Sequence, residues 1–181
     1  YKHKQWKFRR FRRFGGIIMI ISLLRIDDRL IHGQVATSWV KATACDAIFA
    51  VNDAVTNDEL RKTLLMQVAP PDIKTFIITV EKAIAVYKNP KYEKTKVLML
   101  VTNPSDILRL IDGGVDIKSI NVGGMTFKDG NKLISSAVAI GPQDLEAFKK
   151  LRDKGIELEI RKLASHSKED LAPKLDGFKF D

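Results

Sequence analysis

Apolar residues occur along the chain in seven short runs, and most segments between these runs have helical spacing. Most of the runs are apolar at positions that would face both sides of a sheet, which is typical of strands covered by helices on each side. Strands that alternate with helices indicate a parallel sheet with right-handed crossovers. The pattern therefore predicts an α/β fold with an open, mainly parallel seven-stranded sheet and helices on both faces. The predicted strands are residues 17–25, 47–51, 75–80, 96–101, 117–122, 133–140 and 156–163.

The predicted helices begin and end at residues that favour helix termini. Thr56, followed three positions later by Glu59, has the pattern of a capping box. The dipeptides Asn103-Pro104 and Gly141-Pro142 place proline at the first helical position. The predicted helices are residues 32–43, 57–68, 81–88, 104–112, 142–154 and about 168–175, the last with Ser167 as its cap.

The chain has no internal repeat and no linker that would divide it. With 181 residues, it has the length of one ordinary domain with a core of its own. The link between the fifth and sixth predicted strands contains glycine pairs but no helical run, so we expect one irregular or antiparallel step there. Cys45 is the single cysteine, so the chain has no disulfide framework, as is common in the cytoplasm. No apolar run approaches the roughly 20 residues that span a bilayer.

The net charge of +9 belongs mostly to residues 1–15, which hold seven basic residues and no acidic one. Without those seven, 24 basic residues face 22 acidic ones, a net charge of +2. Aromatic residues interleave with the cations, so this arm also fits a nucleic-acid-binding tail. A signal peptide is excluded because the apolar run leads into Arg25 without a small-residue cleavage site. We interpret residues 1–18 as upstream or vector-derived sequence, with Met19 as a natural start, and residues 19–181 as a single domain.

The stretch RIDDRLIHGQV, residues 25–35, lies where the first strand gives way to the first helix. Ligands of open α/β sheets bind outside the carboxyl ends of the strands, and amides at a helix N-terminus attract anions. Arg25 and Arg29 supply forked donors that suit phosphate oxygens, and Gly33 lets the backbone approach closely. A histidine in such a cradle can act as a nucleophile. The residues therefore indicate that His32 carries a phosphoryl group.

The neighbouring acids suggest how His32 would be prepared for this role. Asp27 or Asp28 can accept a hydrogen bond from one ring N–H, which fixes the tautomer and leaves the other nitrogen bare. The plainer interpretation, a capping histidine among surface ion pairs, stays open from the residues alone. His3 lies in the arm and His166 in the tail, so His32 is the only histidine at a predicted strand-to-helix junction.

The motif RIDDRLIHGQV resembles the active-site segment of the IIB component of the bacterial phosphoenolpyruvate-dependent sugar phosphotransferase system, in its mannose/fructose/sorbose family. The similarity covers about residues 19–165, and the order and spacing of its segments are those of that family. The further segments that carry it are NDELRKTLLMQVAPP (57–71), VYKNPKY (86–92), TNPSDILRLIDGGV (102–115), NVGGM (121–125) and QDLEAFKKLRDKGIELEIR (143–161).

The resemblance implies a phosphotransferase that takes a phosphoryl group from phosphohistidine on a IIA protein and carries it on His32. It then passes the group to a mannose-, fructose- or sorbose-type sugar that the membrane components IIC and IID hold during import. The resemblance also implies a homodimer in the cytoplasm, peripheral to the inner face of the membrane, with no metal or organic cofactor and no nucleic-acid partner. Arg25 and Arg29 match the two arginines that the family uses around the phosphoryl group.

Further residues are expected to support the phosphoryl site. We expect Arg25, anchored in the strand, to hold the resting phosphohistidine, and Arg29 to act in onward transfer. The double glycine after the fifth strand can give close backbone approach and is a possible part of the cradle. Other polar residues at this sheet edge, such as Asn52 and Asn103, are expected to be turn residues. The expected supporting residues are Asp27, Asp28, Gly33 and Gln34, with Gly123 and Gly124 as possible cradle residues.

Two other classes of protein fit the same pattern less well. A nucleotide-binding enzyme on a doubly wound sheet would need GxGxxG or GxxxxGK[ST] to cradle phosphate, and the chain has neither. A nucleic-acid-binding or other phosphate-ligand-binding module would act through the basic arm or the same sheet edge. The identity of the sugar cannot be read from the sequence.

Overall fold

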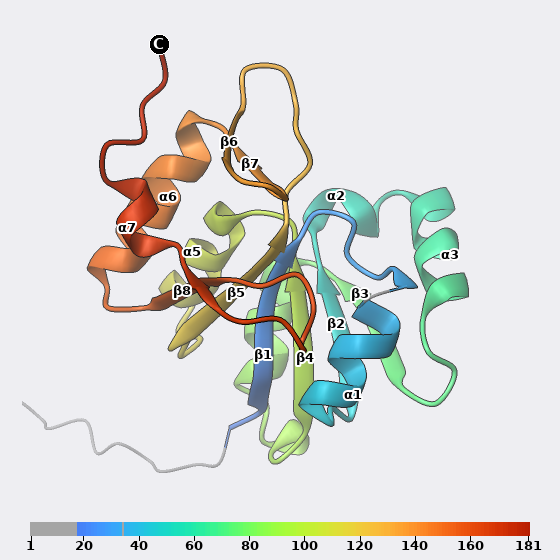
Figure 1. The fold of residues 1–181 in the computed structure, drawn as a ribbon. Coiled ribbons are helices and arrows are strands. Elements are labelled where there is room, and N and C mark those ends of the chain that lie inside the picture. Colours follow the sequence, from blue (N-terminus) through green and yellow to red (C-terminus); the bar gives the residue numbers. More distant parts are fainter. Residues whose placement is uncertain (1–17, 34) are drawn as a thin grey trace, which may run out of the picture.

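The structure is a computed structural model that describes residues 18–33 and 35–181. Its centre is a seven-stranded sheet with the order β3-β2-β4-β1-β5-β8-β9, in which only the β8–β9 pair is antiparallel (Figure 1). The predicted α/β fold with a mainly parallel seven-stranded sheet is confirmed. The strands are β1 (Ile20–Asp27), β2 (Ala47–Val51), β3 (Lys74–Ile78), β4 (Lys96–Val101), β5 (Ser119–Gly124), β8 (Glu157–Ile160) and β9 (Glu169–Asp170).

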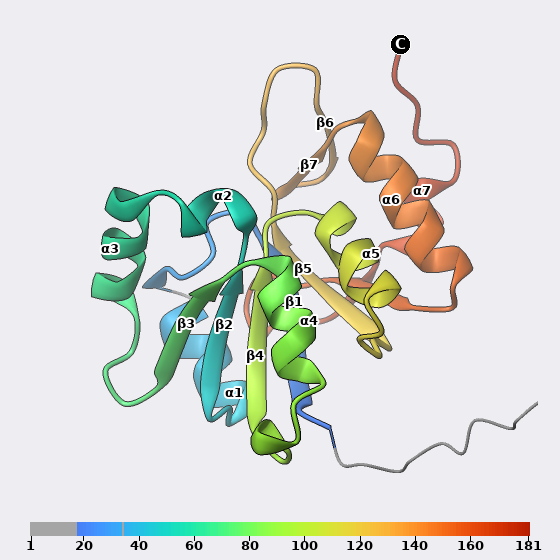
Figure 2. The same cartoon turned by 180° about the vertical axis from the view of Figure 1, so that it is seen from behind.

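Helices cover both faces of the sheet, as the views from the two sides show (Figures 1 and 2). Successive residues of the buried strand β2 point to opposite faces: Ile48 packs in a cluster with Trp39 and Leu65, whereas Phe49 packs on the other side with Ala83 and residues of three further helices. The two apolar faces explain why the central strands read as continuous apolar runs. The helical segments are η1 (Val35–Trp39, a π-helix), α1 (Val40–Thr43), α2 (Asp53–Thr56), α3 (Glu59–Val68), α4 (Val80–Tyr87), η2 (Pro90–Tyr92, a 3₁₀-helix), α5 (Pro104–Asp112), α6 (Pro142–Asp153) and α7 (Ala172–Leu175).

Helix starts agree with the sequence in two places and differ in a third. Asn103 accepts a hydrogen bond in the first turn of α5, and α6 begins directly after Gly141. The predicted cap at Thr56 is wrong. The Asn52 side chain instead caps the separate short helix α2, and Asp58 caps α3. Two cap residues therefore divide a segment that the sequence presents as one helix.

The segments near the C-terminus differ from the prediction in two ways. The predicted strand 133–140 is a hairpin, β6 (Lys132–Ser135) and β7 (Val138–Ile140), which forms a separate two-stranded sheet. Ser136 and Ala137, in the middle of that run, form its turn. The predicted helix 168–175 is shortened to α7, because β9 pairs with β8 and supplies the seventh strand of the main sheet.

Strand β1 lies in the middle of the sheet, between β4 and β5. The chain leaves β1 towards η1 and α1 on one face and leaves β4 towards α5 on the other face (Figures 1 and 2). Such divergence opens a crevice at the carboxyl ends of adjacent strands, where α/β proteins bind ligands. Among the described residues, no helix is long and apolar enough to cross a membrane. The basic arm predicted for residues 1–18 lies almost wholly outside the described residues.

Candidate functional site

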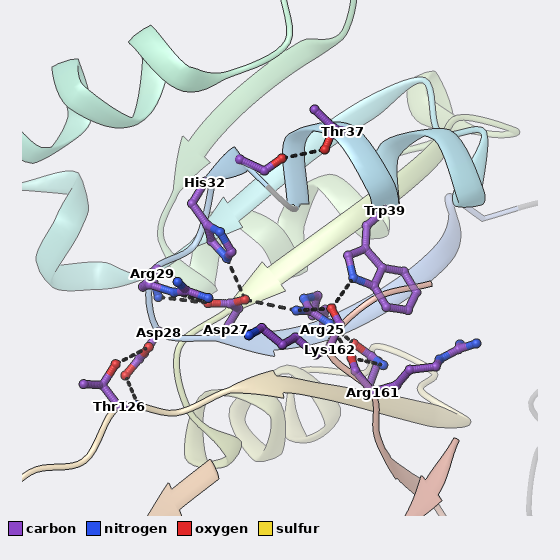
Figure 3. Close-up of polar contacts among 12 residues, drawn as sticks. Arg25, Asp27, Asp28, Arg29, His32, Thr37, Trp39, Thr126, Arg161 and Lys162 are labelled. Atoms are coloured by element: carbon purple, nitrogen blue, oxygen red, sulfur yellow. Dashed lines mark hydrogen bonds and ion pairs between the residues drawn. The ribbon is translucent and has the colours of Figure 1, made fainter. Parts of the chain in front are cut away.

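The carboxylate of Asp27, the last residue of β1, lies at the centre of the candidate site and is fully buried (Figure 3). Its Oδ2 atom is 2.8 Å from Nε2 of His32 and 3.1 Å from Nη2 of Arg25. Its Oδ1 atom accepts the backbone N–H of Arg29 at 3.2 Å and lies 3.6 Å from Nε of the same arginine. One acidic group therefore contacts the histidine and both arginines of the motif.

A tight turn after β1 returns His32 to Asp27. The backbone N–H of Leu30 donates to the carbonyl of Asp27 at 2.9 Å, and Leu30 has a φ of 56°, in the left-handed region that bulky residues rarely adopt. The side chain of Leu30 is fully buried in the cluster that contains Trp39, and this burial offsets the cost of the turn. The carbonyl of His32 accepts the N–H of Ala36 at 2.8 Å, so the helical segment starts at the histidine.

The charge on Asp27 determines which nitrogen of His32 carries the proton. Burial raises the pKa of Asp27. The hydrogen bond with His32, the charge of His32 when it is protonated and the charge of Arg25 outweigh that effect, so the pKa lies below its ordinary value. At neutral pH, Asp27 is therefore ionised and can only accept hydrogen bonds, so neutral His32 donates from Nε2. The lone pair of the ring is then on Nδ1. The His32 side chain is 18% exposed, which leaves part of the ring in contact with solvent.

The structure places Arg29 and Gly33 on the open side of the site. The Arg29 side chain is 55% exposed, so its terminal amino groups can turn towards a group bound to His32. Gly33 is exposed, and a β-carbon there would meet no atom within 4 Å. The space beside this glycine is therefore open. The predicted supporting residue Gln34 lies outside the described residues.

Arg25, which we expected beside the imidazole as a holder of the phosphoryl group, lies in the interior of the site. Its side chain is only 1% exposed, and its guanidinium donates to the carbonyls of Arg161 at 2.9 Å and Lys162 at 3.2 Å. Burial lowers the pKa of Arg25, while the nearby Asp27 carboxylate counteracts that effect. Arg25 and Asp27 lie on the same face of β1, and the Arg25 side chain lies beside Asp27 on the side towards Trp39 (Figure 3).

The double glycine after the fifth strand, a possible part of the phosphoryl cradle, lies against Arg25 and Asp27. A methyl group at Gly123 would overlap the Arg25 guanidinium, so only glycine fits there. Gly124 lies beside Asp27, and its carbonyl accepts the N–H of Asp28 at 3.2 Å. The predicted cradle residues therefore support the buried arginine and the loop.

Asp28 anchors the loop and does not contact His32. Its carboxylate accepts the backbone N–H of Thr126 at 2.6 Å and the hydroxyl of the same residue at 3.0 Å (Figure 3). Its carbonyl accepts Nη2 of Arg61 from α3 at 3.1 Å. Of the two acids that the sequence offered as partners of the histidine, Asp27 has that position.

A polar cavity of about 490 Å³ lies beside the loop at the same sheet edge. It is lined by residues that follow four strands, among them Arg29, Asn52, Asn103 and Thr126. Asn52 and Asn103, which we expected to be turn residues, serve as helix caps. His166 is exposed and belongs to no such edge, and His3 lies outside the described residues.

Several buried residues behind the site were not predicted from the sequence. Asn121 accepts from Arg25, and Glu159 contacts both Asn121 and Arg161. Asn121 is a polar residue inside an apolar strand, a signal that could have identified it. Glu157 and Glu159 occupy alternate positions in IELEI, a pattern typical of the exposed face of a strand. The sequence therefore gave no sign that Glu159 is buried.

Comparison with solved structures identifies the class of protein that this fold and site define. The structure is similar to the IIB domain of the sorbose permease from Klebsiella pneumoniae, with a TM-score of 0.85 and 45% sequence identity. The match covers 90% of this chain and 100% of that one. The chain therefore has the fold of a IIB component of a phosphotransferase system.

Residues 21–180 match the family described as "PTS system sorbose subfamily IIB component". The chain belongs to this family, which confirms the resemblance in the sequence. The sorbose-specific EIIB component of Lacticaseibacillus casei is 47% identical over 158 residues, 87% of this chain and 96% of that protein. The mannose-specific EIIAB component of Escherichia coli K12 is 52% identical over 161 residues, 87% of this chain. The aligned part covers 50% of that mannose-specific relative, so this chain spans about half of its length.

Proposed function

We propose that this protein carries a phosphoryl group on Nδ1 of His32, between a phosphohistidine of a IIA protein and a sugar held by the membrane components IIC and IID. The observation that carries the proposal is the 2.8 Å contact between Nε2 of His32 and the ionised, buried Asp27. This contact leaves Nδ1 as the nitrogen with a free lone pair. Membership of the IIB family supports the same reaction class.

Each transfer breaks one bond to phosphorus and forms another. In the first step, the Nδ1 lone pair of His32 attacks phosphorus while the P–N bond to the donor histidine breaks, and the donor ring keeps the electron pair. The proton on Nε2 stays in place, so the ring becomes positively charged when Nδ1 bonds to phosphorus. The negative charge of Asp27 stabilises that form. In the second step, a sugar hydroxyl attacks phosphorus, the P–Nδ1 bond breaks, and the hydroxyl proton leaves to a base or solvent.

The oxygens of the transferring group need positive partners that can reach them. Arg29 has a mostly exposed guanidinium next to Asp27, and it is the motif arginine with this freedom. Its planar fork can contact two phosphoryl oxygens at once. We therefore assign stabilisation of the transferred group to Arg29 and assign Arg25 to the support of Asp27.

Labelled phosphoryl transfer tests the proposal. Phospho-IIA is mixed with the wild-type protein and with His32→Ala and His166→Ala variants, and label on each chain is counted. We expect label on the wild type and on His166→Ala, in a bond that is labile in acid and stable in base, and none on His32→Ala. Label at the wild-type level on His32→Ala, or an acid-stable bond, would contradict the proposal.

The partners and the location belong to the same proposal. The E. coli relative is named a mannose-specific EIIAB component, a name that joins a IIA and a IIB part and supports IIA as the phosphate donor. Relatives named for mannose and for sorbose support a hexose as the acceptor. We also propose a cytoplasmic homodimer that meets IIC and IID at the membrane, which light scattering and co-sedimentation with IIC/IID membranes would test. The family match begins at residue 21 and does not include the arm.

A further inference from the structure

The buried polar side chains of the described residues form a single connected group. Four such residues are nearly inaccessible to solvent: Arg25 (1%), Asp27 (0%), Asn121 (1%) and Glu159 (6%). They come from three adjacent strands, β1, β5 and β8, and occupy neighbouring positions in the register. At one end of the group, Asp27 contacts His32.

Hydrogen bonds connect these residues in order. Oδ1 of Asn121 accepts from Nη1 of Arg25, and Nδ2 of Asn121 donates to Oε1 of Glu159 at 3.2 Å. The same Oε1 atom accepts from Nη2 of Arg161 at 3.1 Å. An unbroken path therefore runs from Arg161 through Glu159, Asn121 and Arg25 to Asp27.

Trp39 fixes the two arginines of this path from the side. The guanidinium carbons of Arg25 and Arg161 each lie 5.0 Å from the centre of the Trp39 ring, a favourable distance for cation–π contact. The indole N–H donates to the carbonyl of Lys162 at 3.1 Å, and Arg25 donates to the same carbonyl (Figure 3). The Arg25 guanidinium is thereby confined in position and in plane.

The group is costly for folding, because burying charged and polar atoms is unfavourable unless every atom is paired. Among the described residues, Nε of Arg25, Oε2 of Glu159 and Nε of Arg161 are buried and have no hydrogen-bond partner. An apolar filling of the same space would avoid these costs. A group that costs stability and ends on the functional histidine is best explained by a role at that histidine.

We propose that Asn121 and Glu159 are positioning residues for His32, acting through Arg25 and Asp27; this inference rests on the proposed phosphocarrier function. Asn121 aims the Arg25 guanidinium so that Nη2 meets Oδ2 of Asp27. Glu159 balances the charge of Arg161 and orients the amide of Asn121. The Asp27 carboxylate is thereby held against Nε2 of His32, and Nδ1 stays unprotonated.

Two variants and a matched control test this proposal. Asn121→Ala removes the link, and Glu159→Gln removes the charge with almost no change in size. Glu157→Gln is the control, because Glu157 lies two residues away on the same face of β8 and is exposed. Folding of each variant is checked by near-UV circular dichroism. The measurements are the ¹⁵N spectrum of the histidine rings, assigned with His32→Ala, and the rate of phosphate acceptance from phospho-IIA.

We expect the wild type and Glu157→Gln to hold the His32 proton on Nε2 and to accept phosphate at equal rates. In Asn121→Ala and Glu159→Gln, the ring should populate both tautomers, and acceptance should slow by about tenfold, the lower end of the range for residues that orient functional histidines. If Asn121→Ala does not fold, the isosteric Glu159→Gln decides alone. A folded Glu159→Gln with the wild-type ring spectrum and rate would overturn the proposal.

A double-mutant cycle separates positioning from a merely structural role. If Glu159 acts through Asp27, adding Glu159→Gln to Asp27→Asn should change the acceptance rate by less than about twofold, because the path is already broken. An undiminished tenfold loss in that background would also overturn the proposal. The ring spectrum needs no phosphate donor, so it tests the positioning role independently of phosphate transfer. If the wild type accepts no phosphate, the proposed function is refuted, and the ring spectrum still decides the positioning role.

Discussion

Replacing Asp27 with asparagine is the most direct test of how the site prepares His32. The two carboxylate oxygens face four N–H groups: one from Arg25, one from His32, and the backbone N–H and Nε–H of Arg29. An amide has one acceptor oxygen, so in either orientation its NH₂ group faces donors. If NH₂ faces His32, the ring proton must move to Nδ1, and the proposed nucleophile is blocked.

The magnitudes follow from the burial of the group. Removing one partner of a buried ion pair costs about 3–5 kcal/mol, so the free energy of unfolding of Asp27→Asn should fall by that amount. Phosphate acceptance should slow by between about 10²-fold, the loss of one charged contact, and about 10⁴-fold, the loss of tautomer control. Urea denaturation measures the first quantity, and rapid-quench labelling from phospho-IIA measures the second at a temperature where the variant is folded.

The neighbouring Asp28→Asn variant is the matched comparison. Its carboxylate contacts Thr126 and not His32, so we expect a stability loss of about 1 kcal/mol and less than about tenfold slower acceptance. The reasoning is refuted if folded Asp27→Asn accepts phosphate as fast as Asp28→Asn does. A ring spectrum of His32 that is unchanged in Asp27→Asn would refute the tautomer argument specifically.

Further predictions concern stability and the second half-reaction. Arg29→Gln should leave the free energy of unfolding within about 0.5 kcal/mol of the wild type, because the side chain is mostly exposed; it should slow transfer to sugar in IIC/IID membranes by about 10²-fold or more. Arg29→Lys should restore that rate only in part. Gly123→Ala should cost about 1–3 kcal/mol in urea denaturation, because its methyl group overlaps Arg25; stability equal to the wild type would contradict this packing. The pKa of Asp27 is lowered in the folded protein, so the ionised carboxylate stabilises the fold. The difference in free energy of unfolding between the wild type and Asp27→Asn should therefore have its full value above about pH 3.9, the ordinary pKa of aspartate. It should shrink as the pH falls through the lower pKa of the folded protein. A difference that grows on acidification would contradict the direction of that shift.

Local and periodic features of the sequence were sufficient for the class of fold and for the position of the histidine. Apolar runs that alternate with helical segments predicted the parallel sheet, because burial on both faces demands continuous apolar strands. The caps at Asn103 and Gly141 were predicted correctly, because each acts within one turn of the chain. The place of His32 after the first strand follows from chain order alone, since parallel strands of an α/β sheet end at the ligand-binding edge.

The tertiary structure alone decided what each polar residue of the site contacts. The sequence led us to expect both Arg25 and Arg29 at the phosphoryl group, but the Arg25 side chain is buried between strands and the Arg29 side chain is largely exposed. Gly123 was a possible phosphate-cradle residue in the sequence, and in the structure its neighbour is the guanidinium of Arg25, 98 positions earlier in the chain. The partition of 133–140 into a hairpin and the recruitment of β9 to the sheet likewise depend on pairing between distant segments. Periodicity indicates which face of a helix or strand is apolar. It carries no information on which distant residue will lie opposite a given side chain. That pairing sets the charge of Asp27 and the position of the proton on His32.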